Sequence, residues 1–213
     1  MGIYLNAGND LFAQAVNSEI YVDKSMLIRL TNERLNSNDR HLCISRPRRF
    51  GKSMAANMLV AYYSRNCDSK GIFSSLAIAR EPDFEEHLNK YNVIHLDMTR
   101  FASKAPDVKG MIDRLEITLK QELSELCSDI SYPDFYSSDE ILTLIYNKYR
   151  VPFVFIIDEW DCVFRIHKND TEGQTAYLDY LKILLKDRPY VALDYATGIL
   201  PVKKYGQHSA LNM

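Results

Sequence analysis

The stretch HLCISRPRRFGKSMAANM, residues 41–58, contains the order of elements from which the fold can be assigned. A short apolar run at 42–44 is followed by a polar loop and then by Gly51-Lys52-Ser53. Apolar residues then recur every three or four positions, as on one buried face of a helix. They are Met54, Ala55, Met58, Leu59 and Tyr62. The stretch therefore predicts a strand, a loop and a helix, which is the context of phosphate-binding loops.

The loop has the residue types that a nucleoside triphosphate site needs. Backbone N–H groups from Phe50 to Met54 would converge at the start of the helix, where the helix dipole also attracts anions. Gly51 lets the backbone approach the phosphates, and Lys52 can place a positive charge beside the terminal ones. The Ser53 hydroxyl can serve as one ligand of a Mg²⁺ that keeps most of its waters.

The loop also departs from the common pattern. In G-x-x-x-x-G-K-[ST] the first glycine falls at position 46, where this chain has Arg46. The tripeptide alone also fits an ordinary strand-to-helix turn with a capping serine. Arg46, Arg48 and Arg49 form a local basic patch that suits an anion, and the alternative is a solvated loop face.

Composition limits the class of protein. With 213 residues, of which 46% are apolar, the chain predicts one domain around one sizeable core. A net charge of -2 disfavours a globally basic nucleic-acid binder. The four cysteines form no C-x-x-C pair, and Cys43 and Cys162 beside apolar runs are expected to be buried. No apolar run approaches the roughly 20 residues that span a bilayer, which favours a cytoplasmic protein without membrane contact.

The rest of the chain alternates between strand and helix patterns. Expected strands span residues 42–44, 92–98, 151–157 and 190–196, with a short extended piece at 20–22. Expected helices span residues 24–30, 54–62, 107–127, 140–149 and 177–185, the first of them capped by Asp23. The run at 151–157 is apolar on both faces, as a central parallel strand must be. The pattern predicts an α/β fold in which helices cover both faces of a parallel sheet, with a ligand crevice at the carboxyl ends of the strands. Residues 1–39 would form a lead-in and residues 40–213 the core.

A second acidic segment follows the most apolar strand. Asp158 and Glu159 come directly after Ile157. Asp158 could hold Mg²⁺ through water opposite Ser53, and Glu159 could orient or deprotonate a water that attacks the terminal phosphate. The alternative is an ordinary polar strand exit. Asp161 could be a further acid near the metal or a helix cap.

Two polar residues in the strands need separate interpretation. Thr197, at the end of the last strand, could sense the terminal phosphate, or it could be only a turn residue. His95 lies within the second strand and has no histidine or cysteine at ligand spacing. We therefore expect His95 to be a structural residue.

Four segments together resemble the bacterial AAA-ATPase-like family of P-loop proteins. They are SRPRRFGKS at 45–53, IIDE at 156–159, TGILP at 197–201 and YVDK at 21–24. Members of that family carry arginine where Arg46 stands. The resemblance implies a parallel-sheet P-loop NTPase core of the ASCE type, with a glutamate matching Glu159 and a polar sensor matching Thr197. It also implies that the segment at 21–24 lies near the base of the bound nucleotide.

The resemblance raises expectations about partners as well. Proteins of this family usually continue into a helical lid and often into a nuclease domain, whereas this sequence ends at Met213. We expect the lid and a later strand to be missing or supplied by another chain. A protein partner or an oligomer could provide that lid or an arginine finger. Nucleic acid would be reached only through a nuclease companion.

Three functions fit the sequence. The first is a Mg²⁺-dependent module that binds and hydrolyses ATP, with Lys52 and Glu159 as catalytic residues and Ser53 and Asp158 at the metal. In it Arg46, Phe50, Gly51, Lys52, Ser53, Met54 and Thr197 would contact the nucleotide. The second is a nucleotide-switched interaction protein with little or no turnover. The third is a phosphotransferase, for which nothing marks an acceptor pocket.

Overall fold

The computed structural model describes residues 2–200. It contains β1 (His41–Ser45), β2 (Asn92–Asp97), β3 (Phe153–Asp158) and β4 (Val191–Gly198). These strands form one sheet in the order β1-β4-β3-β2, and every neighbouring pair is parallel. The predicted α/β fold with a parallel sheet is therefore confirmed. All four expected strands lie within one or two residues of their predicted bounds.

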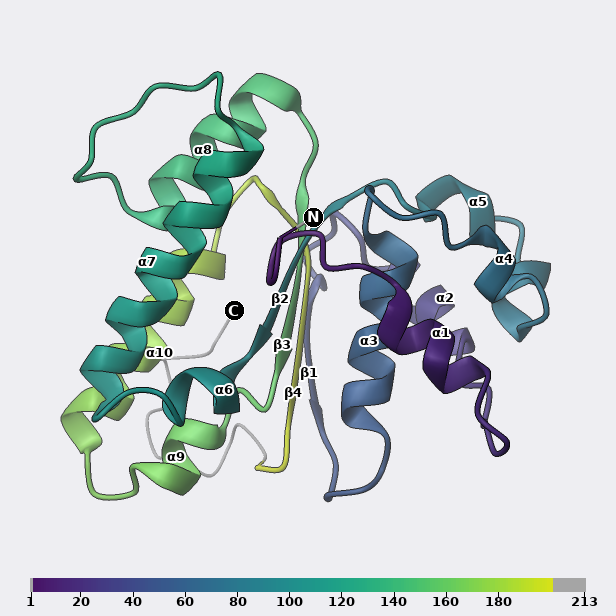
Figure 1. Ribbon diagram of the computed structural model, residues 1–213, viewed down its shortest axis with the longest axis horizontal. Helices are drawn as coiled ribbons and strands as arrows, with labels where there is room; N and C mark the ends of the chain where they lie inside the picture. Colours follow the sequence, from purple (N-terminus) through teal and green to yellow (C-terminus); the bar gives the residue numbers. More distant parts are fainter. Residues whose placement is uncertain (1, 201–213) are drawn as a thin grey trace.

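Helices cover both faces of the sheet, which Figure 1 shows edge-on between them. One face carries α1 (Asp10–Val16), α2 (Met26–Asn32), α3 (Lys52–Tyr63), α4 (Lys70–Phe73), the 3-10 helix η1 (Ala77–Arg80) and α5 (Phe84–His87). The other carries α6 (Met98–Ala102), α7 (Val108–Leu126), α8 (Ser138–Tyr149), α9 (Cys162–Ile166) and α10 (Thr171–Leu185).

The central strand β3 supplies side chains to two separate cores. Phe153, Phe155 and Ile157 pack with the helices of the α7 side, whereas Val154 and Ile156 pack with α3 and its neighbours. Every residue of β3 is buried. Because full burial of such a side chain contributes about 1.5–3 kcal/mol, β3 is fixed in position from both faces. Its carboxyl end is correspondingly well placed to hold functional groups.

Helix α3 differs from the amphipathic helix that its spacing predicts. Residues 58–63 are buried on all sides, while Met54, expected to be buried, is 40% exposed. The cause is the N-terminal part of the chain, which wraps the side of α3 that faces away from the sheet. The Phe73 ring stacks on Phe12 and meets Tyr62 edge-on. On the first turn of α3, beside the loop, Ser53 and Met54 remain exposed.

Three other local expectations are wrong. Residues 20–22 form no strand, and Asp23 accepts the Ser25 N–H and the Ala77 N–H without capping α2 directly. Cys43 is exposed, because β1 lies at the edge of the sheet that residues 2–200 form; Cys162 is buried as expected. The short helices α1, α6 and α9 had no sequence prediction.

The opposite edge of the sheet is covered by the start of the chain. Leu5 bridges Ile94 in antiparallel fashion, and the His95 N–H donates to the Tyr4 carbonyl. Burial lowers the pKa of His95. The Glu122 carboxylate accepts N–H groups of residues 3–5 and so fixes this segment. Among residues 2–200, no helix has the length and apolar character needed to cross a membrane.

Gly198, the last residue of β4, packs closely against Trp160 and Asp161. A Cβ atom there would lie 2.7 Å from Trp160 Nε1 and 2.9 Å from Asp161 Oδ1. We expect Gly198→Ala to lower the free energy of unfolding by about 1–3 kcal/mol, as overpacking does. Urea denaturation measures the change. In the control Gly71→Ala, on α4, the new Cβ meets nothing within 4 Å, and stability should rise by roughly 0.5–1 kcal/mol. Equal effects of the two substitutions would contradict the packing at Gly198.

Candidate functional site

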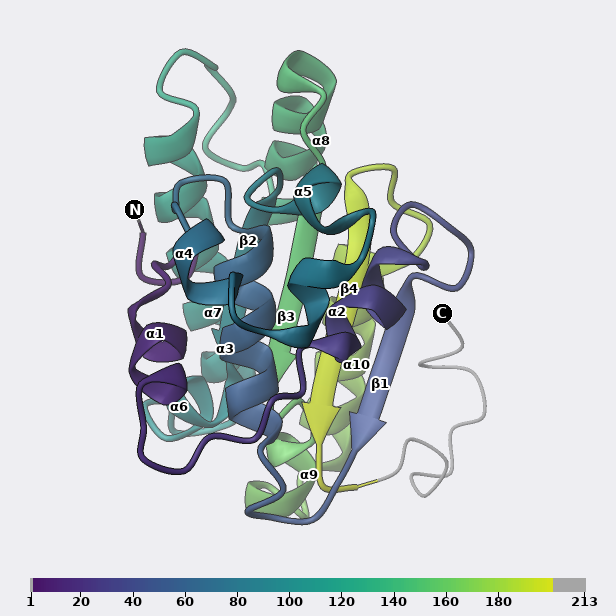
Figure 2. The same ribbon diagram turned by 90° about the vertical axis from the view of Figure 1, so that its right-hand side faces the viewer.

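The loop between β1 and α3 lies at the carboxyl end of the sheet. Figure 2 shows β1, β3 and β4 ending at one side of the molecule, where this loop and α9 also lie. Arg49 and Gly51 both have positive φ, +69° and +77°. Glycine adopts this conformation without cost, whereas for arginine it costs about 1–2 kcal/mol. The loop therefore folds back on itself before α3 begins.

The first turn of α3 presents backbone donors to this loop. Its N-cap is Gly51, and no side chain caps it. The N–H groups at the start of a helix have no acceptors within that helix. Backbone N–H groups at the end of a curved loop are the kind of donor to which anions bind in proteins.

Lys52 extends from this turn into the interior. The residue is only 8% exposed. Its Nζ donates to the Pro47 carbonyl oxygen at 3.3 Å and lies 3.6 Å from Glu159 Oε1. The ammonium group therefore faces an acid from the end of β3, although β4 lies between β1 and β3 in the sheet. Lys52 and Glu159, two of the predicted site residues, are in direct contact.

Asp158 and Thr197 form a buried pair next to this contact. Thr197 Oγ1 donates to Asp158 Oδ1, which also accepts the Glu159 N–H at 3.1 Å. The register brings Asp97, at the end of β2, alongside Asp158. The Thr197 hydroxyl and the Glu159 N–H therefore donate to the same oxygen of Asp158. Thr197, expected near the terminal phosphate, thus contacts the predicted metal-binding acid.

Glu159 is held in an unusual backbone conformation. Its φ is +54°, in the left-handed region. Non-glycine residues keep such a conformation, at a cost of about 1–3 kcal/mol, where the surroundings impose it, and they often occur at functional sites. The Glu159 carboxylate lies between two cations, because Oε2 also accepts a hydrogen bond from Arg165 Nη2.

Asp161 is fully buried and binds the chain that follows β4. Its Oδ2 accepts the N–H groups of Ile199 and Leu200 at 3.0 and 2.8 Å and lies 3.4 Å from Arg165 Nε. Asp161 occupies the N-cap position of α9, but its side chain makes no capping hydrogen bond there. No three metal-ligating His, Cys, Asp or Glu side chains gather anywhere within residues 2–200.

The other predicted residues lie at the surface of the loop. Arg46 is exposed, and its backbone N–H donates to the Gly198 carbonyl at 3.0 Å. Phe50 is 60% exposed, and Ser53 and Met54 are exposed on the first turn of α3. In this structure these four side chains do not share the buried contact between Lys52 and Glu159.

Two contacts at the site were not predicted from the sequence. Lys24 Nζ donates to the Phe50 carbonyl at 3.3 Å and lies 3.3 Å from the position of a Cβ at Gly51. Arg165 contacts both Glu159 and Asp161. The four-residue spacing of Asp161 and Arg165 was a visible signal, since such pairs meet on a helix. The resemblance places the segment at 21–24 near the nucleotide base, but it does not predict the contact of Lys24 with the loop backbone.

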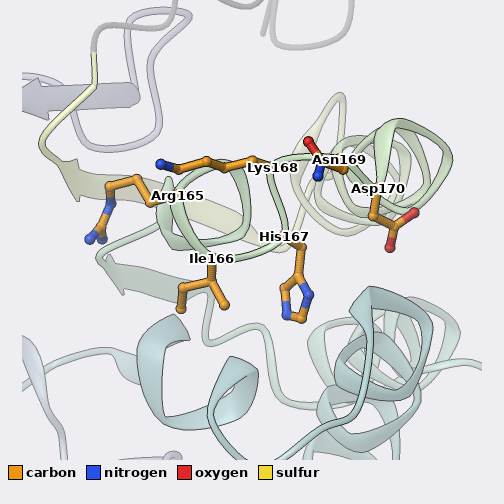
Figure 3. A pocket seen from close by; sticks show the side chains of 6 residues that line it. All are labelled: Arg165, Ile166, His167, Lys168, Asn169 and Asp170. Carbon is orange, nitrogen blue, oxygen red and sulfur yellow. The ribbon is translucent and has the colours of Figure 1, made fainter.

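A shallow hollow of about 550 Å³ lies beside this cluster, between α9 and α10. It is lined by Arg165, Ile166, His167, Lys168, Asn169 and Asp170. Figure 3 shows Arg165 extending from α9 toward the strand ends, whereas His167 does not point toward them. Arg165 therefore belongs to both the hollow and the Glu159 contact.

A parallel sheet in the order β1-β4-β3-β2, with a Gly-Lys-Ser loop after β1 and acids after β3, defines the core of a P-loop NTPase-like protein. The model of the AAA-ATPase-like family, described as predicted AAA-ATPases, matches residues 9–207. The chain belongs to this family. No curated protein matches the sequence.

The buried pair of Thr197 and Asp158 gives a prediction about stability. Thr197→Val removes the hydroxyl while keeping the shape of the side chain. We expect a loss of about 1.5–3 kcal/mol in the free energy of unfolding, the range for a hydrogen bond to a charged group. Urea denaturation measures it. In the control Thr175→Val, at a partly exposed position of α10 where the hydroxyl donates to the Thr171 carbonyl, the change should stay within about 0.5 kcal/mol. A Thr197 variant as stable as the wild type would show that the hydrogen bond contributes nothing.

Proposed function

We propose that this chain is a Mg²⁺-dependent module that binds ATP and hydrolyses its terminal phosphate. The observation that carries the proposal is the 3.6 Å approach of Lys52 Nζ to Glu159 Oε1. These residues follow two non-adjacent strands, β1 and β3, and their side chains meet at the carboxyl end of the sheet, where ligands bind in open α/β folds.

Binding would begin with the backbone of the loop. The N–H groups of Phe50 to Met54 and the close approach allowed at Gly51 would receive the phosphates. Lys52 would exchange the Pro47 carbonyl and Glu159 for phosphate oxygens. Arg46 adds positive charge at the rim, where it would raise the local concentration of an anionic ligand.

The residues present also fit a magnesium ion. The Ser53 hydroxyl would be a direct ligand, and Asp158 would accept a hydrogen bond from a metal-bound water. Mg²⁺ usually keeps several waters and takes one or two protein ligands with phosphate oxygens, so no dedicated cage is required. The ion, when bound, would neutralise charge that develops on the phosphates.

Glu159 would act on the attacking water. Its carboxylate would orient the water and accept its proton as the new P–O bond forms and the bond to the bridging oxygen breaks. The products are ADP and inorganic phosphate, which takes the proton from Glu159. Thr197 would act through Asp158, by fixing one of its oxygens.

We propose a single domain, with residues 1–39 as the lead-in to the core. A partner chain or an oligomer would supply a lid or an arginine finger, and contact with nucleic acid would depend on a nuclease companion. The cysteines are all free, which suits the reducing cytoplasm.

Two substitutions test binding and hydrolysis separately. Lys52→Ala should weaken ATP binding roughly 10- to 100-fold, since a charge-assisted hydrogen bond contributes about 1.5–3 kcal/mol. Glu159→Gln should bind ATP at least as tightly as the wild type. In this variant Lys52 has no ion pair with a carboxylate to break before it contacts the phosphates. The same substitution should also slow phosphate release by about 100-fold or more. Calorimetry with Mg²⁺ and a phosphate-release assay measure these effects.

The control is Lys109→Ala, an exposed lysine on α7, which should leave both measurements unchanged. A wild-type protein that binds no ATP would overturn the proposal. Binding without phosphate release would instead support a nucleotide-switched interaction protein. Unchanged turnover in Glu159→Gln would remove Glu159 from its proposed role.

A further inference from the structure

The two oxygens of the Glu159 carboxylate have different partners. Oε1 lies 3.6 Å from Lys52 Nζ, and Oε2 accepts a hydrogen bond from Arg165 Nη2. The two cations come from different elements, α3 and α9. One oxygen therefore faces the phosphate-binding loop and the other faces away from it.

Arg165 is itself fixed in place. Its Nε lies 3.4 Å from Asp161 Oδ2, the oxygen that also accepts the N–H groups of Ile199 and Leu200. Among the described residues Nε has no hydrogen-bond partner, so Asp161 attracts the guanidinium by charge; because this group is planar and rigid, the attraction also orients its other nitrogens. The position of Arg165 thus depends on the buried Asp161 and on the backbone after β4.

The backbone of Glu159 needs such support. A left-handed φ of +54° is unfavourable for glutamate. Asp158 Oδ1 holds the Glu159 N–H, and the Glu159 carbonyl accepts the Cys162 N–H at 2.9 Å. These hydrogen bonds fix the backbone of Glu159, and the hydrogen bond from Arg165 fixes its carboxylate.

We propose that Arg165 is a positioning residue that holds Glu159 Oε2, so that Oε1 is directed at the place where the attacking water would lie. This inference rests on the proposed function. When phosphate draws Lys52 away, Oε1 loses its partner while Oε2 keeps Arg165. One oxygen then becomes available to accept a hydrogen bond from water, without reorientation of the side chain.

Substitution of Arg165 tests this role with the full chain. Arg165→Gln keeps most of the length and a polar end, and Asp161 retains two N–H donors, so the fold should persist. We expect kcat for phosphate release to fall roughly 10- to 100-fold, because a small misplacement of a catalytic group has effects of this size. The Kd for ATP with Mg²⁺ should stay within about twofold, since Arg165 holds no phosphate-binding group in this account.

Three further variants separate positioning from a purely structural role. Arg165→Lys, which restores the charge, should recover part of kcat. In a Glu159→Gln background, Arg165→Gln should cause no further loss, because the group that it positions is gone. The exposed Arg114→Ala on α7 should behave as wild type. Thermal denaturation of every variant shows whether it is folded.

The outcomes distinguish the two proposals. If the wild type releases phosphate and Arg165→Gln matches its kcat, the role of Arg165 is overturned and the proposed function stands. An equal further loss in the Glu159→Gln background would also overturn it, because Arg165 would then act independently of Glu159. A wild type without phosphate release would overturn both proposals.

Discussion

The approach of Lys52 to Glu159 depends on the parallel arrangement of the sheet. Because all four strands run in the same direction, everything that follows a strand emerges at one end. The loop after β1 and the acids after β3 are therefore neighbours, although about 100 residues separate them along the chain. The resulting ion pair between the buried Lys52 and Glu159 is one that neither segment could form alone.

A second group of contacts, between the ends of β3 and β4, stabilises this arrangement. Thr197 binds Asp158, Asp161 binds the chain just after β4, and Gly198 leaves room for Trp160. Every one of these contacts joins the end of β3 to the end of β4. The residues at the end of β4 thus fix the positions of the acids that follow β3. A side chain larger than that of Gly198 would clash with Trp160 and Asp161.

The sequence predicted the parallel sheet, and the closeness of Lys52 to the acid after β3, for identifiable reasons. Hydrophobic periodicity marks buried strands and long helices, and the rule that parallel strands share one carboxyl edge brought Lys52 and Glu159 together. The exposure of Met54 and Cys43 could not be predicted, because it depends on which elements cover α3 and β1. The contacts of Lys24 and Arg165 are likewise tertiary: Lys24 meets a carbonyl 26 residues away, and Arg165 acts from a five-residue helix without a periodic pattern.

We propose that Lys52 and Glu159 face each other across a site for a magnesium triphosphate. The most direct measurement is a crystal structure with Mg²⁺ and a non-hydrolysable ATP analogue. We predict the terminal phosphate beside Lys52 Nζ, with Glu159 on its far side and the loop amides around the inner phosphates. An analogue bound elsewhere on the protein, or one whose phosphates do not contact Lys52, would contradict the account.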